Sequence, residues 1–103
     1  MRKIKISDDA YYDIEEMFAY ISQDNKKAAA DLKKRIYKNI KDLIHFPYKY
    51  PAVQDEDAWG AERGYRYMVV KPYIVFYRVL DDAIIIARIL HSRQNALHVL
   101  FDL

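Results

Sequence analysis

The sequence predicts an α+β fold in which an antiparallel two-helix hairpin packs on one face of a sheet. Two observations support this prediction. Apolar residues in the N-terminal half recur at helical spacing, and three runs rich in Val, Ile, Tyr and Phe follow one another over residues 65–91. A chain of 103 residues with 52% hydrophobic content can bury one core but not two. We therefore expect residues 1–103 to form a single domain.

The chain begins with a pattern typical of a short strand followed by a helix. Residues 3–7 alternate charge and isoleucine, which suits a strand at a sheet edge or beside the other strands. Ser7 is a good N-cap, and Asp8 and Asp9 follow it where the helix dipole favours negative charge. We expect the first helix over residues 7–23, with an apolar stripe made by Tyr11, Ile14, Met17, Phe18 and Ile21.

A second helix is predicted over residues 26–45. Asp24 and Asn25 end the first helix and can cap the second. The buried stripe of the second helix consists of Ala29, Leu32, Ile36, Ile40 and Leu43. Because the connection is short, the two helices form an antiparallel hairpin that can cover one sheet face. The irregular residues 46–62 then lead to the sheet, and connections of this length are often functional.

Three consecutive strands are predicted over residues 65–70, 73–80 and 83–91. Short breaks at Lys71 and Pro72 and at Asp81 and Asp82 make this an antiparallel meander. A first turn centred on residues 71–72 places Arg66 opposite Tyr77. A second turn centred on residues 81–82 places Tyr77 opposite Ile86.

The same register places Val75 opposite Arg88. Because side chains alternate between the two faces of a strand, Arg66, Tyr77 and Arg88 would emerge together on one face. Arg78 and His91 would lie on the other face. A turn with an odd number of residues would flip one strand relative to its neighbour.

These side chains suit phosphate chemistry. The guanidinium groups of Arg66 and Arg88 match phosphate oxygens, His91 can transfer protons near neutral pH, and Tyr77 can stack on a base or donate a hydrogen bond. The set fits metal-independent RNA cleavage, in which a 2′-hydroxyl attacks the adjacent phosphate, and it fits docking of an acidic peptide equally well. The predicted catalytic residues of a ribonuclease are therefore Arg66, Tyr77, Arg88 and His91.

Other basic side chains are candidates for contacts with nucleic acid or a protein partner, namely Arg63, Lys71, Arg78 and Arg93. Every such residue also has a simpler interpretation. Strand arginines are usually solvated or ion-paired, and a histidine at a strand end is usually structural.

Composition excludes several classes of site. The absence of cysteine excludes disulfides, thiol catalysis and cysteine-ligated zinc, and two glycines cannot build a glycine-rich phosphate loop. The histidines have no metal-ligand spacing, so we expect no metal or other cofactor. No apolar run reaches membrane-spanning length and the N-terminus lacks the apolar core of a signal peptide, so we expect a cytoplasmic protein without membrane contact. Between residues 60 and 95, six basic residues against three acidic ones favour an anionic partner.

The order of strand, helix hairpin, irregular segment and meander resembles the RelE/ParE superfamily of bacterial toxins from type II toxin-antitoxin systems, often labelled plasmid stabilization proteins. The most specific similarities lie in residues 66–79 and 86–95. The second run, RILHSRQN after Ala87, is similar to the closing Arg-hydrophobic-hydrophobic-His-x-Arg-x-Asn/Asp pattern of the family. The resemblance implies a growth-inhibiting toxin neutralised by a cognate antitoxin, which folds around the toxin on binding.

The resemblance also implies two alternative targets. RelE-like toxins cleave messenger RNA in the ribosomal A site, whereas ParE-like toxins inhibit DNA gyrase. Residues 88–95 resemble the end of ParE-like chains, and Ala96 and Leu97 stand where the ribonuclease branch commonly has a functional tyrosine. We therefore favour a gyrase inhibitor over a ribosome-dependent mRNA endonuclease. A third hypothesis is a degenerate toxin that only binds its antitoxin.

Overall fold

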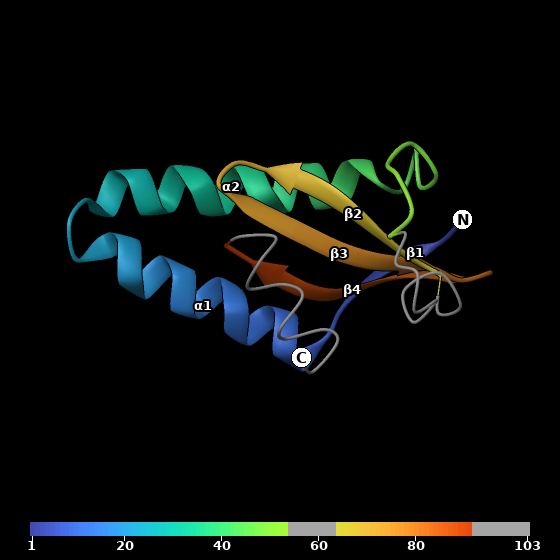
Figure 1. Ribbon diagram of the computed structural model, residues 1–103, viewed down its shortest axis with the longest axis horizontal. Coiled ribbons are helices and arrows are strands. Elements are labelled where there is room, and N and C mark those ends of the chain that lie inside the picture. Colours follow the sequence, from blue (N-terminus) through green and yellow to red (C-terminus); the bar gives the residue numbers. More distant parts are fainter. Residues whose placement is uncertain (54–63, 92–103) are drawn as a thin grey trace.

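The structure, a computed structural model, describes residues 1–53 and 64–91, which form a four-stranded sheet and two helices (Figure 1). In chain order the elements are β1 (Lys3–Ile6), α1 (Asp8–Ser22), α2 (Lys26–Asp42), β2 (Tyr65–Val70), β3 (Tyr73–Val79) and β4 (Ala83–Leu90). The strand order is β1-β4-β3-β2, with β1 parallel to β4 and the other pairs antiparallel. The predicted α+β fold is therefore confirmed, and the single domain over residues 1–103 stays a prediction.

Both helices begin at the predicted caps. The Ser7 hydroxyl accepts a hydrogen bond from the Ala10 N–H at 3.0 Å, and the Asn25 side chain accepts one from the Ala28 N–H at 2.9 Å. Helix α2 ends at Asp42, earlier than the predicted residue 45. The reason is that residues 43–45 donate to carbonyls three residues back, which is the tighter spacing of a helix end.

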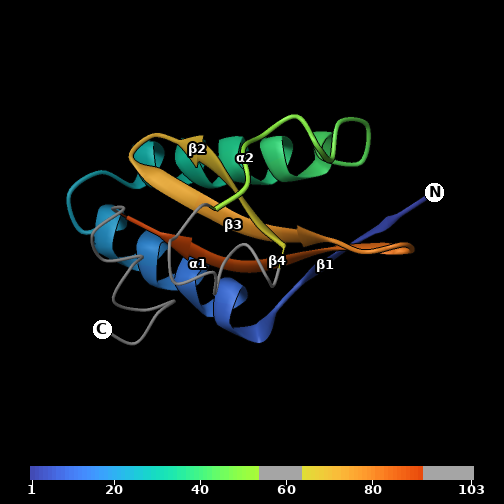
Figure 2. The ribbon, with the colours of Figure 1, turned by 45° about the vertical axis from the view of Figure 1, so that its right-hand side comes forward.

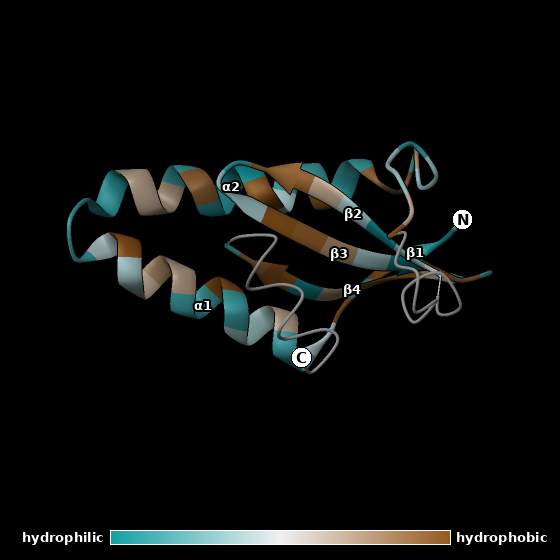
Figure 3. Cartoon of the chain, viewed as in Figure 1, coloured by the Kyte–Doolittle hydropathy of each residue, from teal (hydrophilic) through white to brown (hydrophobic). Residues whose placement is uncertain are grey.

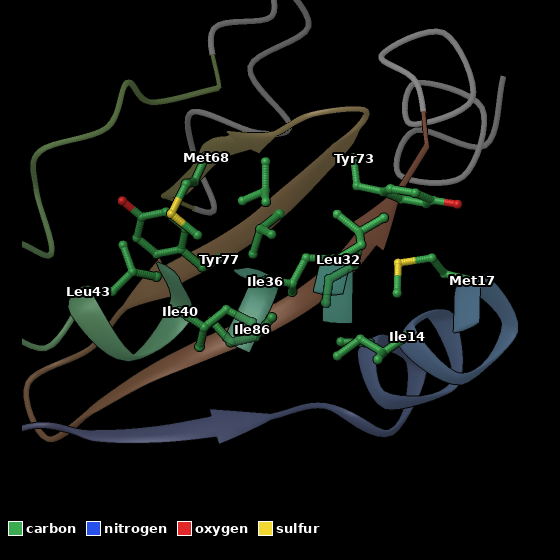
Figure 4. Packing of buried hydrophobic residues seen from close by; sticks show 14 of the residues in the cluster. Ile14, Met17, Leu32, Ile36, Ile40, Leu43, Met68, Tyr73, Tyr77 and Ile86 are labelled. Atoms are coloured by element: carbon green, nitrogen blue, oxygen red, sulfur yellow. The ribbon is translucent and has the colours of Figure 1, made fainter. Parts of the chain in front are cut away.

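The hydrophobic core lies between the helix hairpin and one face of the sheet (Figure 2). Apolar residues gather on the strands and on the inner sides of the helices, while the outer sides of the helices are hydrophilic (Figure 3). Fully buried side chains from both layers meet in this core, among them Ile14, Ile36, Ile40, Met68, Tyr77 and Ile86 (Figure 4). A second cluster around Phe76 and Leu90 contains no residue of α1 or α2, so the two helices cover one face of the sheet.

The predicted strand register is correct up to a β-bulge in β4. Arg66 faces Tyr77 and Tyr77 faces Ile86, as expected. Beyond that point Arg88 faces Phe76 and not Val75, because Ala87 is an extra residue opposite the step from Phe76 to Tyr77. Ala87 is held there by the hydroxyl of Ser7, which donates to its carbonyl at 2.9 Å.

The segment after α2 forms backbone hydrogen bonds along the outer edge of β2. The Val53 N–H donates to the Tyr65 carbonyl at 2.8 Å, and the Tyr67 N–H donates to the Pro51 carbonyl at 3.1 Å. Ala52 forms an isolated antiparallel bridge with Arg66. Residues 46–53 therefore reach the start of β2, where the first strand arginine lies.

Neither α1 nor α2, the helices of the described residues, has the length and apolar character that a membrane span requires.

Candidate functional site on the arginine-bearing strands

Arg88 forms a two-pronged ion pair with Asp13 of α1. The Arg88 Nε donates to Asp13 Oδ2 at 2.7 Å and its Nη2 donates to Oδ1 at 2.9 Å. Only 7% of the Asp13 side chain and 25% of the Arg88 side chain are exposed. The hydrogen bonds to Asp13 raise the pKa of Arg88 against the opposing effect of burial, so the guanidinium stays charged. One edge of this guanidinium is therefore occupied by the protein itself.

Because β1 is short, part of the edge of β4 is left for Asp13 to bind. Strand β1 pairs with β4 only as far as Ile6 opposite Ile86, and within residues 1–53 and 64–91 no other strand pairs with this edge of β4 beyond that point. The Asp13 Oδ2 accepts a hydrogen bond from the Ile89 N–H at 3.0 Å and so satisfies a donor of that strand edge. Asp13 thus binds both the side chain and the backbone of β4.

Asp13 is the residue that the sequence prediction missed, although a local signal was present. It shares the inward-facing stripe of α1 with Ala10, Ile14 and Met17, at the i, i+3, i+4 and i+7 spacing of a buried helix face. It is the one charged residue in the described part of the chain that is buried. An acidic residue in such a stripe indicates a buried partner, because an unpaired charge is costly to bury.

Arg66 and Tyr77 lie on the same face, as predicted, but both bind the segment after α2. The hydroxyl of Tyr77 donates to the Pro47 carbonyl at 2.9 Å, and Arg66 Nη1 donates to the Tyr50 carbonyl at 2.7 Å. Tyr77 has no exposed surface. Burial raises the pKa of Tyr77 to about 12, although the positive charge of Arg66 opposes the shift. A base therefore has no access to the ring of Tyr77.

His91 lies on the helix side of the sheet and not on the opposite face as expected. Its ring meets Tyr73 of the main core edge to face, with 5.2 Å between the ring centroids. The difference comes from the bulge, which also turns Ile89, two residues before His91, towards the helices. His91 borders a shallow hollow that is also lined by Asp13, Glu16, Met17, Tyr73, Ile89 and Leu90.

The four predicted catalytic residues therefore separate into two groups. Arg66 contacts the same segment as Tyr77, whereas His91 packs against Tyr73 and borders the hollow with Asp13, the partner of Arg88. Tyr73 and Tyr77 lie at opposite ends of the buried cluster (Figure 4). Four residues of a strand span roughly 13 Å. The prediction that Arg66, Tyr77 and Arg88 emerge together on one face is wrong, because the bulge shifts Arg88 and Asp13 binds it.

The remaining predicted contact residues have different environments. The Arg78 guanidinium lies 5.6 Å from the centre of the Tyr65 ring, and its Nε has no hydrogen-bond partner within the described ranges. Lys71 is exposed at the turn between β2 and β3, where its carbonyl accepts a hydrogen bond from Arg35. Arg63 and Arg93 lie outside the described residues, and the proposed roles of all four in binding stay predictions.

Comparison with known proteins identifies the family. The family model described as ParE toxin of type II toxin-antitoxin system, parDE, matches residues 4–96. The chain belongs to this family. Membership of the ParE toxin family confirms the resemblance to RelE/ParE toxins and makes the chain the toxin of a type II toxin-antitoxin system. No curated protein matches the ParE-family chain.

Solved structures have the same fold as this ParE-family toxin. A chain of the chromosomal ParDE TA system from P. aeruginosa matches with a TM-score of 0.72 and 20% identity, over 90% of this chain and 98% of that one. YafQ from E. coli strain BL21(DE3) matches with a TM-score of 0.61 and 22% identity, over 94% and 98%. The E. coli DinJ-YafQ complex contains a chain with a TM-score of 0.61 and 19% identity, over the same shares.

Loss of the Asp13 charge should destabilise this ParE-family toxin. Replacing Asp13→Asn leaves Arg88 partly buried without its counter-charge, so we expect the free energy of unfolding to fall by about 2 kcal/mol. Urea unfolding at neutral pH measures the change. Glu15→Gln is the matched control, because it breaks the exposed Lys33–Glu15 pair at 3.1 Å and should cost no more than about 0.5 kcal/mol. Equal losses in the two variants would contradict the structural role of Asp13.

Burial of Tyr77 predicts a loss of stability in alkali. Tyrosine in the unfolded chain ionises near pH 10, whereas Tyr77 in the folded protein has a pKa of about 12. The contribution of this pKa difference to the free energy of unfolding is therefore complete below pH 10 and is lost as the pH rises to about 12. At neutral pH, Tyr77→Phe should lower the free energy of unfolding by about 1 kcal/mol, because a hydrogen bond is lost. Over the alkaline range, the stability of this variant should fall less than that of the wild type.

Urea unfolding in a series of alkaline buffers measures this pH dependence. Tyr12→Phe is the control, because Tyr12 is 66% exposed and lies outside the buried core. A Tyr77→Phe variant with the same alkaline slope as the wild type would show that Tyr77 ionises freely in the folded protein.

Proposed function

We propose that this ParE-family toxin arrests growth by binding DNA gyrase and not by cleaving RNA. The observation that supports this most is the use of Arg88 and Tyr77 in the fold. Arg88 is paired with Asp13, and Tyr77 is completely buried beneath the segment that follows α2. Membership of the ParE family, as opposed to the RelE branch, supports the same target.

RNA cleavage without a metal would need these groups at one phosphate. A general base must come within about 2.6–3.2 Å of the proton that it removes, and charge-stabilising donors must approach the developing charge as closely. His91 borders the hollow beside α1, whereas Arg66 contacts the Tyr50 carbonyl beside Tyr77. A set divided in this way suits a protein that acts by binding.

One observation favours the ribonuclease alternative. The exposed His91 and Glu16 border the same hollow, and an imidazole with a neighbouring carboxylate can transfer protons. In this alternative Arg88 would contribute the part of its guanidinium that Asp13 leaves open.

A cognate antitoxin is the expected partner of the toxin. The structural matches include chains from a ParDE TA system and from the DinJ-YafQ complex. Val69 is 51% exposed on β2, and Ile74 of β3 packs in the cluster away from the helices. This sheet face offers apolar surface for an antitoxin segment that folds on binding.

The gyrase proposal predicts that purified toxin inhibits DNA supercoiling and that induced toxin stops DNA synthesis before protein synthesis. His91→Gln should retain inhibition within about twofold, because no proton transfer is involved. A ribonuclease that uses His91 should lose at least about 100-fold in activity from the same change.

The comparison of incorporation rates separates the three hypotheses. An early stop in translation with intact supercoiling would contradict the gyrase proposal and support mRNA cleavage. Normal growth during expression of the folded toxin alone would leave antitoxin binding as its function.

A further inference from the structure

Two arginines from distant parts of the chain meet at one exposed tyrosine. The Cζ of Arg2 lies 5.6 Å from the centre of the Tyr48 ring, and the Cζ of Arg66 lies 5.0 Å from it. Arg2 Nη2 also lies 3.3 Å from the Tyr48 hydroxyl oxygen, to which it donates. Tyr48 is 58% exposed, so this Arg2–Tyr48–Arg66 cluster lies at the surface. Figures 1 and 2 show the N-terminus beside the segment that follows α2.

Both guanidinium groups are oriented without being neutralised. Arg2 Nε donates to the Leu80 carbonyl at 2.8 Å, and Arg66 Nη1 donates to the Tyr50 carbonyl at 2.7 Å. A carbonyl fixes the direction of a guanidinium but carries no net charge to offset it. Among residues 1–53 and 64–91, neither arginine forms an ion pair, which distinguishes them from Arg88. The cluster therefore presents two positive charges in a fixed arrangement.

Further positive charge lies beside the cluster and along α2. The ammonium group of Lys49 lies 5.5 Å from the centre of the Tyr50 ring. Helix α2 contains seven basic and two acidic residues, whereas α1 contains five acidic and no basic residues. Four exposed lysines of α2 share one helix face at spacings of seven, four and three residues, namely Lys27, Lys34, Lys38 and Lys41. An anionic partner is therefore favoured on the side of α2 and repelled by α1.

The chemistry of the cluster selects the kind of anion. Guanidinium groups match phosphate oxygens and keep their charge at any physiological pH. Single-stranded nucleic acid is usually held by bases stacked on open aromatic rings, but cations already lie over the Tyr48 ring. Contacts with the backbone of a duplex need no such open ring.

We propose that the Arg2–Tyr48–Arg66 cluster binds the phosphate backbone of duplex DNA, and that the exposed lysines of α2 add a weaker, general attraction. The choice of DNA rests on the proposed function, because gyrase holds duplex DNA as its substrate. The toxin then contacts the enzyme and its DNA together. Tyr48 serves as the support that holds the two guanidinium groups at the surface.

The test is the binding of purified toxin to a fluorescently labelled DNA duplex of arbitrary sequence, followed by anisotropy at several salt concentrations. Arg2→Gln should weaken binding about tenfold and reduce the slope of log affinity against log salt by about one. Arg2→Lys keeps the charge and should keep the salt slope. Lys26→Gln is the charge-matched control at the hairpin end of α2, and it should change affinity by no more than about twofold (Figure 1).

Several results would overturn the proposal. These are equal losses for Arg2→Gln and Lys26→Gln, the absence of salt-dependent binding by the wild type, and tighter binding to a single strand of the same length. A loss of antitoxin affinity in Arg2→Gln with unchanged DNA binding would assign the cluster to an acidic protein segment instead. Circular dichroism and thermal unfolding establish that each variant is folded.

The design separates this proposal from the gyrase proposal, because DNA binding is measured without gyrase. If the toxin binds duplex DNA through Arg2 but leaves supercoiling intact, the DNA-binding role of the cluster is supported and gyrase inhibition is contradicted. If the Arg2→Gln variant inhibits supercoiling and binds duplex DNA as well as the wild type does, gyrase inhibition is supported and the proposed DNA site is overturned.

Discussion

The carboxylate of Asp13 is the contact on which the arrangement of helix and sheet depends. It accepts hydrogen bonds from the Arg88 side chain and from the Ile89 backbone, at a point where β1 no longer covers the edge of β4. The Ser7 hydroxyl binds the bulged Ala87 just before that point. Asp13 is nearly buried and Arg88 is partly buried, so the loss of either partner leaves a poorly solvated charge. Arg88 therefore has a structural role in joining α1 to β4.

A second set of contacts explains why the surface suits binding. Tyr77 and Arg66 fasten the segment after α2 to the sheet through the carbonyls of Pro47 and Tyr50. The same segment carries Tyr48, which Arg2 reaches from the N-terminus. The strand residues that would suit catalysis are thus used to build the surface, and the charge that remains exposed favours an anionic partner. This division agrees with a toxin that acts by occupying its target.

Local patterns were sufficient to predict most of the fold. Ser7 and Asn25 mark the helix starts, and counting residues from the turns gives the pairing of Arg66 with Tyr77. The bulge could not be predicted in this way, because it is held by contacts with Ser7 and Asp13, about 75–80 residues away along the chain. Its single extra residue changes which face each following side chain occupies, and this explains the wrong placement of His91. The Arg2–Tyr48–Arg66 cluster has no local signal, because its members come from three separate segments.

The double variant Asp13→Asn/Arg88→Gln tests whether Arg88 serves the fold alone and takes no part in chemistry, as we propose. This variant removes both charges but keeps two amide side chains that can bind each other, and the amide oxygen introduced at position 13 can still accept from the Ile89 N–H. The measurement is growth arrest on induction, with folding checked by circular dichroism. If Arg88 serves the fold alone, we expect a folded protein that still arrests growth within about threefold of the wild type. A folded double variant that no longer arrests growth would contradict it, because the guanidinium would then be needed for toxicity itself.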